Sequence, residues 1–302
     1  MRKLDKVKLE FFYLKKAFFN NRLGFKYIKN KFFLAPKILK YSIPLDKEIK
    51  NYNLSVHILS CHSDLVMLCW SLFSFYQSFL VVGQLYIHSD GSLTENDQTL
   101  LKRIFPQVII IKPQAVEKYL EKLDGFPEIR KYRFDKSQFF LMKKLIDPYL
   151  VSSTEQRLVI DSDLLWFKQP QEIEAEIAKN SEHSLMMTNN TETPVFFKDS
   201  LKISDSLARY NSGVVLYNYK NFNLQKLENY LVRFDPANKR NNQFIEQAGY
   251  ATCLENLKAL SKLHYNIADE YNHEMIMKHY TSPKRVLFYA EGLGILKNKI
   301  KL

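Results

Sequence analysis

Two aspartates separated by one residue, Asp161 and Asp163, directly follow the short apolar segment 157–160. Carboxylates at positions i and i+2 just past the end of a strand can reach one divalent cation. Their hard oxygen atoms suit Mg²⁺ or Mn²⁺, and either ion can also bind a nucleotide diphosphate. A turn with two capping aspartates has the same spacing, so the pair indicates a metal site only together with its strand context.

Two further segments place polar side chains beside an apolar run. Asp90 follows the strand-like residues 84–88, where its carboxylate could accept hydrogen bonds from a base or a ribose. Asn211, Ser212 and Gly213 precede the apolar run VVLYNY, and the glycine would allow the backbone to approach a ligand closely. Taken alone, the Asp90 segment favours a plain strand-to-helix turn, whereas the Asn211 segment is equally compatible with a loop that precedes a strand.

The C-terminal third holds two more candidate segments. Glu246 and Gln247 lie in an amide-rich stretch that could bind sugar hydroxyls, and Glu246 could act as an acid, a base or an electrostatic group. His279 offers an imidazole to a metal, and Lys284 and Arg285 could hold phosphate oxygens. A solvated helix start and a charged surface loop are the alternative interpretations.

The elements that must position these residues form a regular pattern from residue 54 onward. We predict strands over 54–60, 84–88, 108–112 and 157–160, and helices over 64–79, 94–105, 114–123 and 135–145. Three strand–helix–strand units in a row predict an α/β fold with a mostly parallel sheet and helices on both faces. Ligands bind at the carboxyl ends of such strands. The motifs G-x-G-x-x-G and G-x-x-x-x-G-K-[ST] are absent, which argues against dinucleotide-binding and P-loop mechanisms.

The positive charge of the chain is concentrated at its N-terminus. Residues 1–50 contain 14 basic and 4 acidic side chains, whereas residues 51–302 contain 30 and 28. The rest of the chain is therefore nearly neutral, which disfavours nucleic acid as a partner because such proteins carry a basic binding face. We divide the chain into a basic aromatic helical arm, residues 1–50, and a domain over residues 51–302.

Aromatic residues recur in the arm about every seven positions, as in Phe11-Phe12, Phe18-Phe19 and Phe32-Phe33. This spacing predicts a helix with an aromatic face and basic residues opposite. Such a helix can lie on an anionic membrane, or it can pack on the domain with a solvated basic rim. Amphipathicity alone leaves both interpretations open.

The three cysteines, Cys61, Cys69 and Cys253, are scattered and odd in number, which predicts buried thiols in a reducing compartment. The sequence contains neither an 18-residue apolar run nor a convincing signal peptide. We therefore expect a cytoplasmic protein, peripheral at the inner membrane face if the arm binds lipid.

Taken in order, these segments resemble nucleotide-sugar-dependent glycosyltransferases of the GT-A fold, and especially bacterial relatives of glycosyltransferase family 8. The resemblance covers roughly residues 54–296. The matching segments are LYIHSDGSLT, VIDSDLLWFKQPQEI with its D-x-D motif, YNSGVVLYNY, IEQAGYA and HYTSPKR. The last segment departs from the family pattern H-x-x-G-x-x-K, because Ser282 replaces the glycine and Arg285 stands at the lysine position.

The resemblance implies a role for each candidate residue. It implies a Mn²⁺ or Mg²⁺ site and a set of catalytic residues at the donor sugar, together with residues that bind the nucleotide sugar. The metal ligands would be Asp161, Asp163 and His279; the catalytic residues Asn211, Glu246 and Gln247; and the nucleotide-sugar-binding residues Ser60, His62, Asp90, Asp161, Ser162, Gly213, Lys284 and Arg285.

The implied function is transfer of a hexose, with retention, from a UDP-sugar to a glycan or lipid-linked acceptor in surface polysaccharide or lipopolysaccharide synthesis. Two alternatives stay open. One is a non-catalytic, transferase-like binding protein docked on a membrane. The other is a sugar nucleotidyltransferase, although the expected Gly-rich phosphate loop is missing after Val56.

Overall fold

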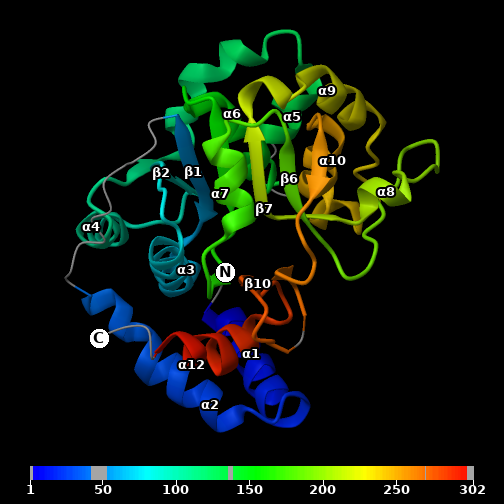
Figure 1. Ribbon diagram of the computed structural model, residues 1–302. Helices are drawn as coiled ribbons and strands as arrows, with labels where there is room; N and C mark the ends of the chain where they lie inside the picture. The colour runs from blue at the N-terminus through cyan, green and yellow to red at the C-terminus, as the bar shows by residue number, and fades with distance from the viewer. Residues whose placement is uncertain (1–2, 42–52, 135–138, 269, 298–302) are drawn as a thin grey trace.

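A computed structural model describes residues 3–41, 53–134, 139–268 and 270–297 of the chain, with side chains from residue 7 onward (Figure 1). The proposed boundary between arm and domain, at residues 50 and 51, lies outside the described residues. So does the start of the helix predicted over 135–145.

Within the described residues, seven strands form a central sheet in the order β3-β2-β1-β4-β7-β6-β8, and three form a small sheet in the order β5-β10-β9. The strands are β1 (Leu54–Ser60), β2 (Gln84–Ser89), β3 (Ile109–Ile111), β4 (Gln156–Ile160), β5 (Leu164–Trp166), β6 (Ser184–Thr188), β7 (Tyr210–Asn218), β8 (Leu257–Ala259), β9 (Tyr265–Asn266) and β10 (Met277–His279). The first four strands of the central sheet run parallel, and β7 runs antiparallel to both of its neighbours. The four strands predicted from sequence are confirmed.

Helices cover both faces of this sheet, as the alternating pattern predicts. Within the described residues, the α-helices are α1 (Lys3–Lys15), α2 (Gly24–Ile28), α3 (Leu65–Ser78), α4 (Glu95–Ile104), α5 (Pro127–Phe134), α6 (Met142–Val151), α7 (Gln171–Ala178), α8 (Asp205–Ala208), α9 (Leu224–Arg233), α10 (Ile245–Cys253), α11 (Arg285–Leu287) and α12 (Leu293–Leu296). Residues 114–123, expected to be α-helical, lie in the 3₁₀-helix Pro113–Leu123. Thr94 caps α4 in a reciprocal capping box with Asp97.

Successive residues of each strand point to opposite faces, so the sheet divides the hydrophobic core into two clusters. On one face, Val56 and Ile58 of β1 pack with α3, α4, the arm and the C-terminal helices. On the other, Val159 of β4 packs with α5, α6, α9 and α10. Of the three cysteines, Cys69 and Cys253 are buried as predicted, whereas Cys61 is only half-buried.

The predicted helix over 135–145 is wrong in extent, because α6 begins at Met142 and continues to Val151 with Pro148 inside it. Proline has no N–H to donate to the carbonyl four residues earlier, which usually ends a helix before it. Here the carbonyl of Lys144 accepts a hydrogen bond from the hydroxyl of Tyr250 at 2.7 Å instead. A partner from a distant helix therefore compensates for the missing backbone bond.

The arm packs on the domain through tyrosine, alanine and isoleucine side chains rather than through its phenylalanines. Tyr27, Ala35 and Ile38 are fully buried in the first core cluster, and Ala35 accepts a hydrogen bond from the indole of Trp70. The helices of the arm lie beside the C-terminal helices, below the sheet in Figure 1. The phenylalanine doublets are exposed, and Lys15 lines the same hollow as Phe11 and Phe18-Phe19, so the expected separation of aromatic and basic faces is wrong.

We expect Ile38→Ala to destabilise the whole protein by about 2–5 kcal/mol, because truncating a buried aliphatic side chain leaves a cavity in the shared core. Urea unfolding followed by circular dichroism measures this change. Phe33→Ala, on the exposed face of the same segment, should change stability by less than about 0.5 kcal/mol. Equal small effects of both variants would show that the arm is not part of the core.

Candidate metal centre

The small sheet brings the residues of the candidate metal centre together. Asp161 follows the end of β4, and Asp163 immediately precedes β5. Strand β10 pairs antiparallel with β5, with His279 opposite Leu164, and the N–H of Tyr280 donates to the carbonyl of Asp163 at 2.9 Å. One ligand atom from each of Asp161, Asp163 and His279 therefore lies within 4.8 Å of the other two.

The imidazole of His279 is oriented by Asn211. The Nδ1 atom of His279 lies 3.1 Å from the Oδ1 of Asn211, which also accepts the N–H of Gly213 at 2.8 Å. Because an amide oxygen only accepts, Nδ1 carries the proton of this hydrogen bond. The Nε2 atom then faces Asp161 Oδ2 at 3.3 Å and Asp163 Oδ1 at 3.1 Å. Such orientation by a carbonyl oxygen is typical of metal-binding histidines, so these residues fit a divalent cation.

Arg285 binds the second oxygen of Asp163. Its Nε and one terminal nitrogen lie 3.1 and 3.0 Å from Asp163 Oδ2, and the other terminal nitrogen lies 3.1 and 3.2 Å from the two oxygens of Asp64. Burial would raise the pKa of Asp163, but His279 and Arg285 outweigh it and hold this pKa well below its ordinary value. Asp163 is therefore ionised, as a metal ligand must be.

Lys144 of α6 connects the metal motif to α10. Its ammonium lies 2.6 Å from Asp161 Oδ1 and 3.1 Å from Glu246 Oε1, and it donates to the carbonyl of Ser212 at 2.8 Å. Burial would lower the pKa of Lys144, but the two carboxylates raise it to about 12. Burial raises the pKa of Glu246, and Lys144 opposes this shift. This lysine therefore stays charged and partly neutralises both carboxylates.

No family model matches the sequence, and no curated protein matches it either. Solved structures do match the fold. The galactosyltransferase LgtC, solved with donor and acceptor sugar analogues, superposes with a TM-score of 0.53 at 12% identity, over 82% of this chain and 96% of LgtC. The bifunctional glycosyltransferase WbbM superposes with a TM-score of 0.52 at 11% identity, over 85% of this chain and 53% of WbbM.

The chain has the GT-A fold. This agrees with the fold expected from the five sequence segments. At such low identity the likeness establishes the fold alone, so the chemistry of this GT-A protein is argued from its own residues.

Several other predicted residues lie at the carboxyl edge of the GT-A sheet but are bound to their own neighbours. The carboxylate of Asp90 accepts hydrogen bonds from both the backbone N–H and the hydroxyl of Ser92. The backbone N–H of Asp90 donates to the carbonyl of Ser60. His62 lies 2.7 Å from Asp97 in α4. Ser60 is buried, and its hydroxyl has no hydrogen-bond partner among the described residues.

The remaining predicted residues differ in how close they come to the cluster. Ser162 is buried between the two aspartates. The side-chain amide of Gln247 donates to the hydroxyl of Thr193, which also accepts a hydrogen bond from Asn189. Lys284 donates to the carbonyl of Ile267 at 2.7 Å, whereas Arg285 binds Asp163 directly. The structure thus places Arg285, rather than Lys284, against the metal motif.

Sequence reasoning missed Lys144, Asp64 and Asn189. Lys144 lies in a helix expected from its apolar residues, and Asn189 binds the amide of Asn211 from the end of β6 at 2.9 Å. Asp64 marks only a helix start in the sequence. A buried lysine or a paired aspartate has no sequence signal of its own, because its partners come from distant elements.

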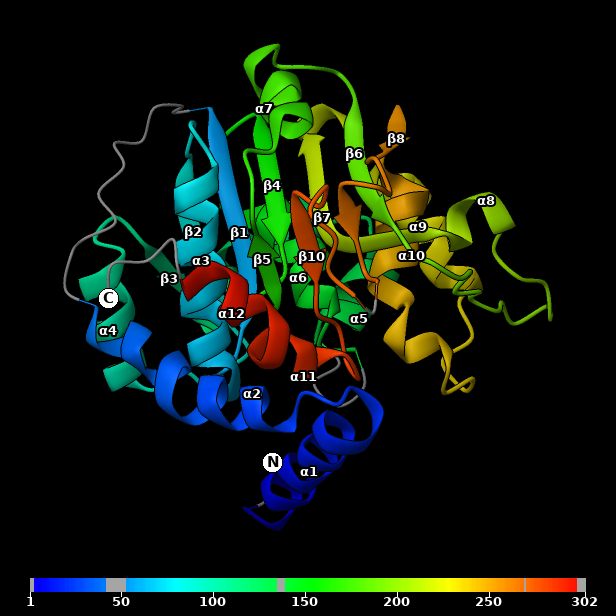
Figure 2. The ribbon, with the colours of Figure 1, turned by 60° about the horizontal axis from the view of Figure 1, so that its bottom comes forward.

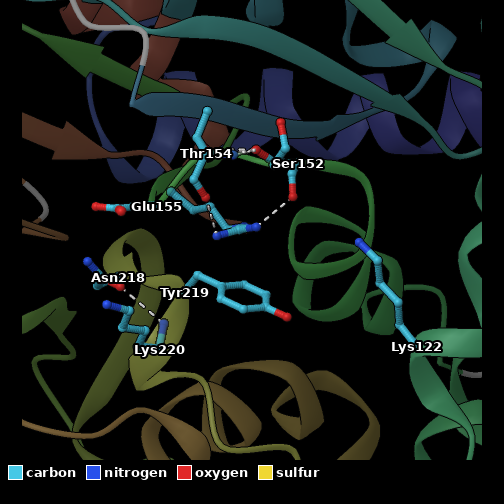
Figure 3. Close-up of a pocket in the computed structure, with 9 residues that line it drawn as sticks. Lys122, Ser152, Thr154, Glu155, Asn218, Tyr219 and Lys220 are labelled. Atoms are coloured by element: carbon cyan, nitrogen blue, oxygen red, sulfur yellow. Dashed lines mark hydrogen bonds between the residues drawn. The ribbon is translucent and has the colours of Figure 1, made fainter.

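A pocket lies at the end of the central sheet opposite the candidate metal centre, and the basic residues that line it have a structural role (Figure 3). It is lined by Lys122, Ser152, Ser153, Thr154, Glu155, Arg157, Asn218, Tyr219 and Lys220. The guanidinium of Arg157 donates to the carbonyls of Pro148, Ser152 and Thr154, and Lys122 donates to that of Leu150. These cations cap the C-terminal end of α6 and interact favourably with its dipole.

Gly213→Ala should weaken Mn²⁺ binding by about 10–100-fold, the usual effect of disturbing a residue that orients a metal ligand. A Cβ at this position would lie 2.5 Å from His279 Nδ1 and 2.9 Å from Asn211 Oδ1, so the imidazole must move. Isothermal titration of Mn²⁺ measures the affinity. Gly294→Ala, whose Cβ would meet its nearest neighbour at 3.6 Å, serves as the matched control and should bind Mn²⁺ like the wild type.

Lys144→Met should destabilise the protein by about 3–5 kcal/mol, because it leaves buried carboxylates without their cation. Glu246→Gln should destabilise the Lys144→Met variant less than it destabilises the wild type. The difference gives a coupling energy of at least about 1 kcal/mol between the two side chains. Urea unfolding of the four proteins measures this coupling. Lys143→Met combined with Glu246→Gln provides the neighbouring control, and these two effects should be additive. Additive effects of Lys144→Met and Glu246→Gln would contradict the network.

Proposed function

We propose that the protein is a metal-dependent glycosyltransferase that moves a sugar from a nucleotide diphosphate-sugar to a glycan or lipid-linked acceptor. The observation that carries this proposal is the cluster of Asp161, Asp163 and His279 within a GT-A fold. LgtC was solved with donor and acceptor sugar analogues, which supports the same substrate classes here. The family 8 resemblance supports a UDP-sugar, transfer of a hexose with retention, and a role in surface polysaccharide or lipopolysaccharide synthesis.

Asp161, Asp163 and His279 would hold the metal ion. Carboxylates suit Mg²⁺ and Mn²⁺, and the imidazole favours the transition metal, so Mn²⁺ is the better match to this donor set. When bound, such an ion neutralises the charge that develops on the leaving nucleoside diphosphate.

The residues of this chain would do the remaining work. Arg285, held between Asp64 and Asp163, would bind diphosphate oxygens together with Lys284, its neighbour in sequence. Asn211 orients His279, and Gly213 leaves room for the imidazole. Glu246, kept in place by Lys144 and Ser212, would face the donor sugar.

The nucleoside end and the donor sugar would be bound by the other predicted residues. Ser60, His62 and Asp90 lie at or just past the carboxyl ends of β1 and β2. Ser162 lies between the two metal-motif aspartates, and Gln247 follows Glu246 in α10. The hydroxyl of Ser60, which has no hydrogen-bond partner among the described residues, would take a partner from the bound nucleotide sugar.

We also propose an anionic membrane surface as the partner of residues 1–40, with the protein peripheral at the cytoplasmic face of the inner membrane. In the part of the chain that is described, no helix is long and apolar enough to cross a bilayer. A non-catalytic, membrane-docked relative would share the fold and the arm. The ionised Asp163 beside a correctly oriented His279 favours a working metal site.

A UDP, GDP, CMP and ADP panel, each with and without Mn²⁺, tests the function by thermal unfolding. At 100 times its Kd, the correct nucleotide should stabilise the native state by about 2.7 kcal/mol, and we expect UDP with Mn²⁺ to do so. In Asp163→Asn this stabilisation should be lost although the protein remains folded. If no nucleotide gives a Mn²⁺-dependent shift, the proposed function is wrong.

A further inference from the structure

The outward face of the arm carries large apolar side chains. Phe11, Phe19, Phe25 and Phe33 are 70, 78, 83 and 70% exposed. Soluble proteins rarely leave apolar groups exposed in a contiguous patch unless the patch binds something. The exposure contrasts with the burial of Tyr13, Ala17, Tyr27 and Ala35 in the same segment.

Several of these aromatic side chains form one connected surface. Phe11, Leu14, Lys15, Phe18 and Phe19 line a shallow apolar hollow. Phe25 continues it, since the rings of Phe18 and Phe25 meet edge to face with centroids 5.6 Å apart. In Figure 2, α1 extends away from the α/β body, and the exposed fractions of Phe11, Phe19 and Phe25 show that this surface is accessible.

Basic residues alternate with the aromatic residues along the arm, and Lys15 lines the same hollow as Phe11, Phe18 and Phe19. Residues 7–40 contain nine lysines and arginines and one acid, Glu10, which is bound to Lys31 and to the hydroxyl of Tyr27. Lys15, Lys26 and Lys29 are exposed. Their charge therefore faces outward beside the phenylalanines.

We propose that this face, defined as Phe11, Phe18, Phe19 and Phe25 with Lys15, Lys26 and Lys29, docks on an anionic lipid bilayer. Aromatic side chains enter the acyl boundary while lysines bind acidic headgroups, which is how interfacial helices bind. Nucleic acid would use the charge but leave the phenylalanines exposed. A second copy would bring two strongly positive faces together.

This inference deepens the proposed function by giving the membrane partner a defined surface and orientation. The arm is part of the fold, and its segment Lys16–Asn20 contacts α11, the helix that begins at Arg285. Docking would thus hold the candidate metal centre close to the headgroups. A transferase held in this way has access to a lipid-linked acceptor.

Co-sedimentation of the full chain with vesicles tests the docking surface. The wild type should bind vesicles of phosphatidylcholine mixed with phosphatidylglycerol, and bind pure phosphatidylcholine much more weakly. Phe11→Ser/Phe19→Ser/Phe25→Ser should reduce binding to the mixed vesicles at least tenfold. The matched control, Leu201→Ser/Val232→Ser/Leu263→Ser, removes three exposed apolar side chains from the body and should bind like the wild type.

A second variant measures how much the lysine charges contribute to vesicle binding. Lys15→Gln/Lys26→Gln/Lys29→Gln should weaken binding to the mixed vesicles roughly 100-fold, at about 1 kcal/mol for each basic residue near the surface. Unchanged binding of the serine variant, or equal loss in its control, would overturn the proposal. So would phenylalanine-dependent dimers that ignore vesicles, or binding of DNA that the lysine variant loses and the serine variant keeps.

The experiments distinguish a failure of the docking proposal from a failure of the proposed enzymatic function. The serine variant should keep the Mn²⁺-dependent stabilisation by nucleotide that the wild type shows. Loss of vesicle binding with nucleotide binding intact supports docking on its predicted residues. Vesicle binding by a wild type that ignores every nucleotide would leave docking standing and contradict only the enzymatic function.

Discussion

The carboxylates of Asp161, Asp163 and Glu246 converge at one edge of the sheet, and each must be compensated, because burying an unpaired ionised carboxylate costs several kcal/mol. Lys144 compensates Asp161 and Glu246 from one side, and Arg285 with His279 compensates Asp163 from the other. These cations come from α6, α11 and β10, so the charge constraint connects the sheet, the helices behind it and the C-terminal segment.

The small second sheet brings His279 to the aspartates, and Gly213 leaves space for its imidazole. Strand β10 returns from the C-terminal segment to pair with β5, which carries His279 to the end of β4. Gly213 in β7 allows the imidazole to approach the strand, and Asn211 fixes its orientation. Arg285 follows six residues later, so one segment supplies both a ligand and a cation. This arrangement explains why motifs far apart in sequence act as one site.

Much of this arrangement could be predicted from the sequence, because alternating strands and helices and the D-x-D motif are local patterns. The strands up to Ile160 and the pairing of Asp161, Asp163 and His279 followed from them together with the family resemblance. Long-range compensation could not be predicted. The helix predicted to end at residue 145 continues past Pro148, where the hydroxyl of Tyr250 donates to the carbonyl of Lys144. The outward direction of the arm's phenylalanines likewise depends on packing that no periodicity reveals.

A crystal structure of the protein with Mn²⁺ and UDP tests the central claim most directly. Anomalous scattering locates manganese without reference to the expected site. The account predicts one strong peak between the Asp161 and Asp163 carboxylates and His279 Nε2, with the diphosphate against it and in reach of Arg285. Manganese bound elsewhere, or a nucleotide bound away from the carboxyl edge of the central sheet, would contradict the account.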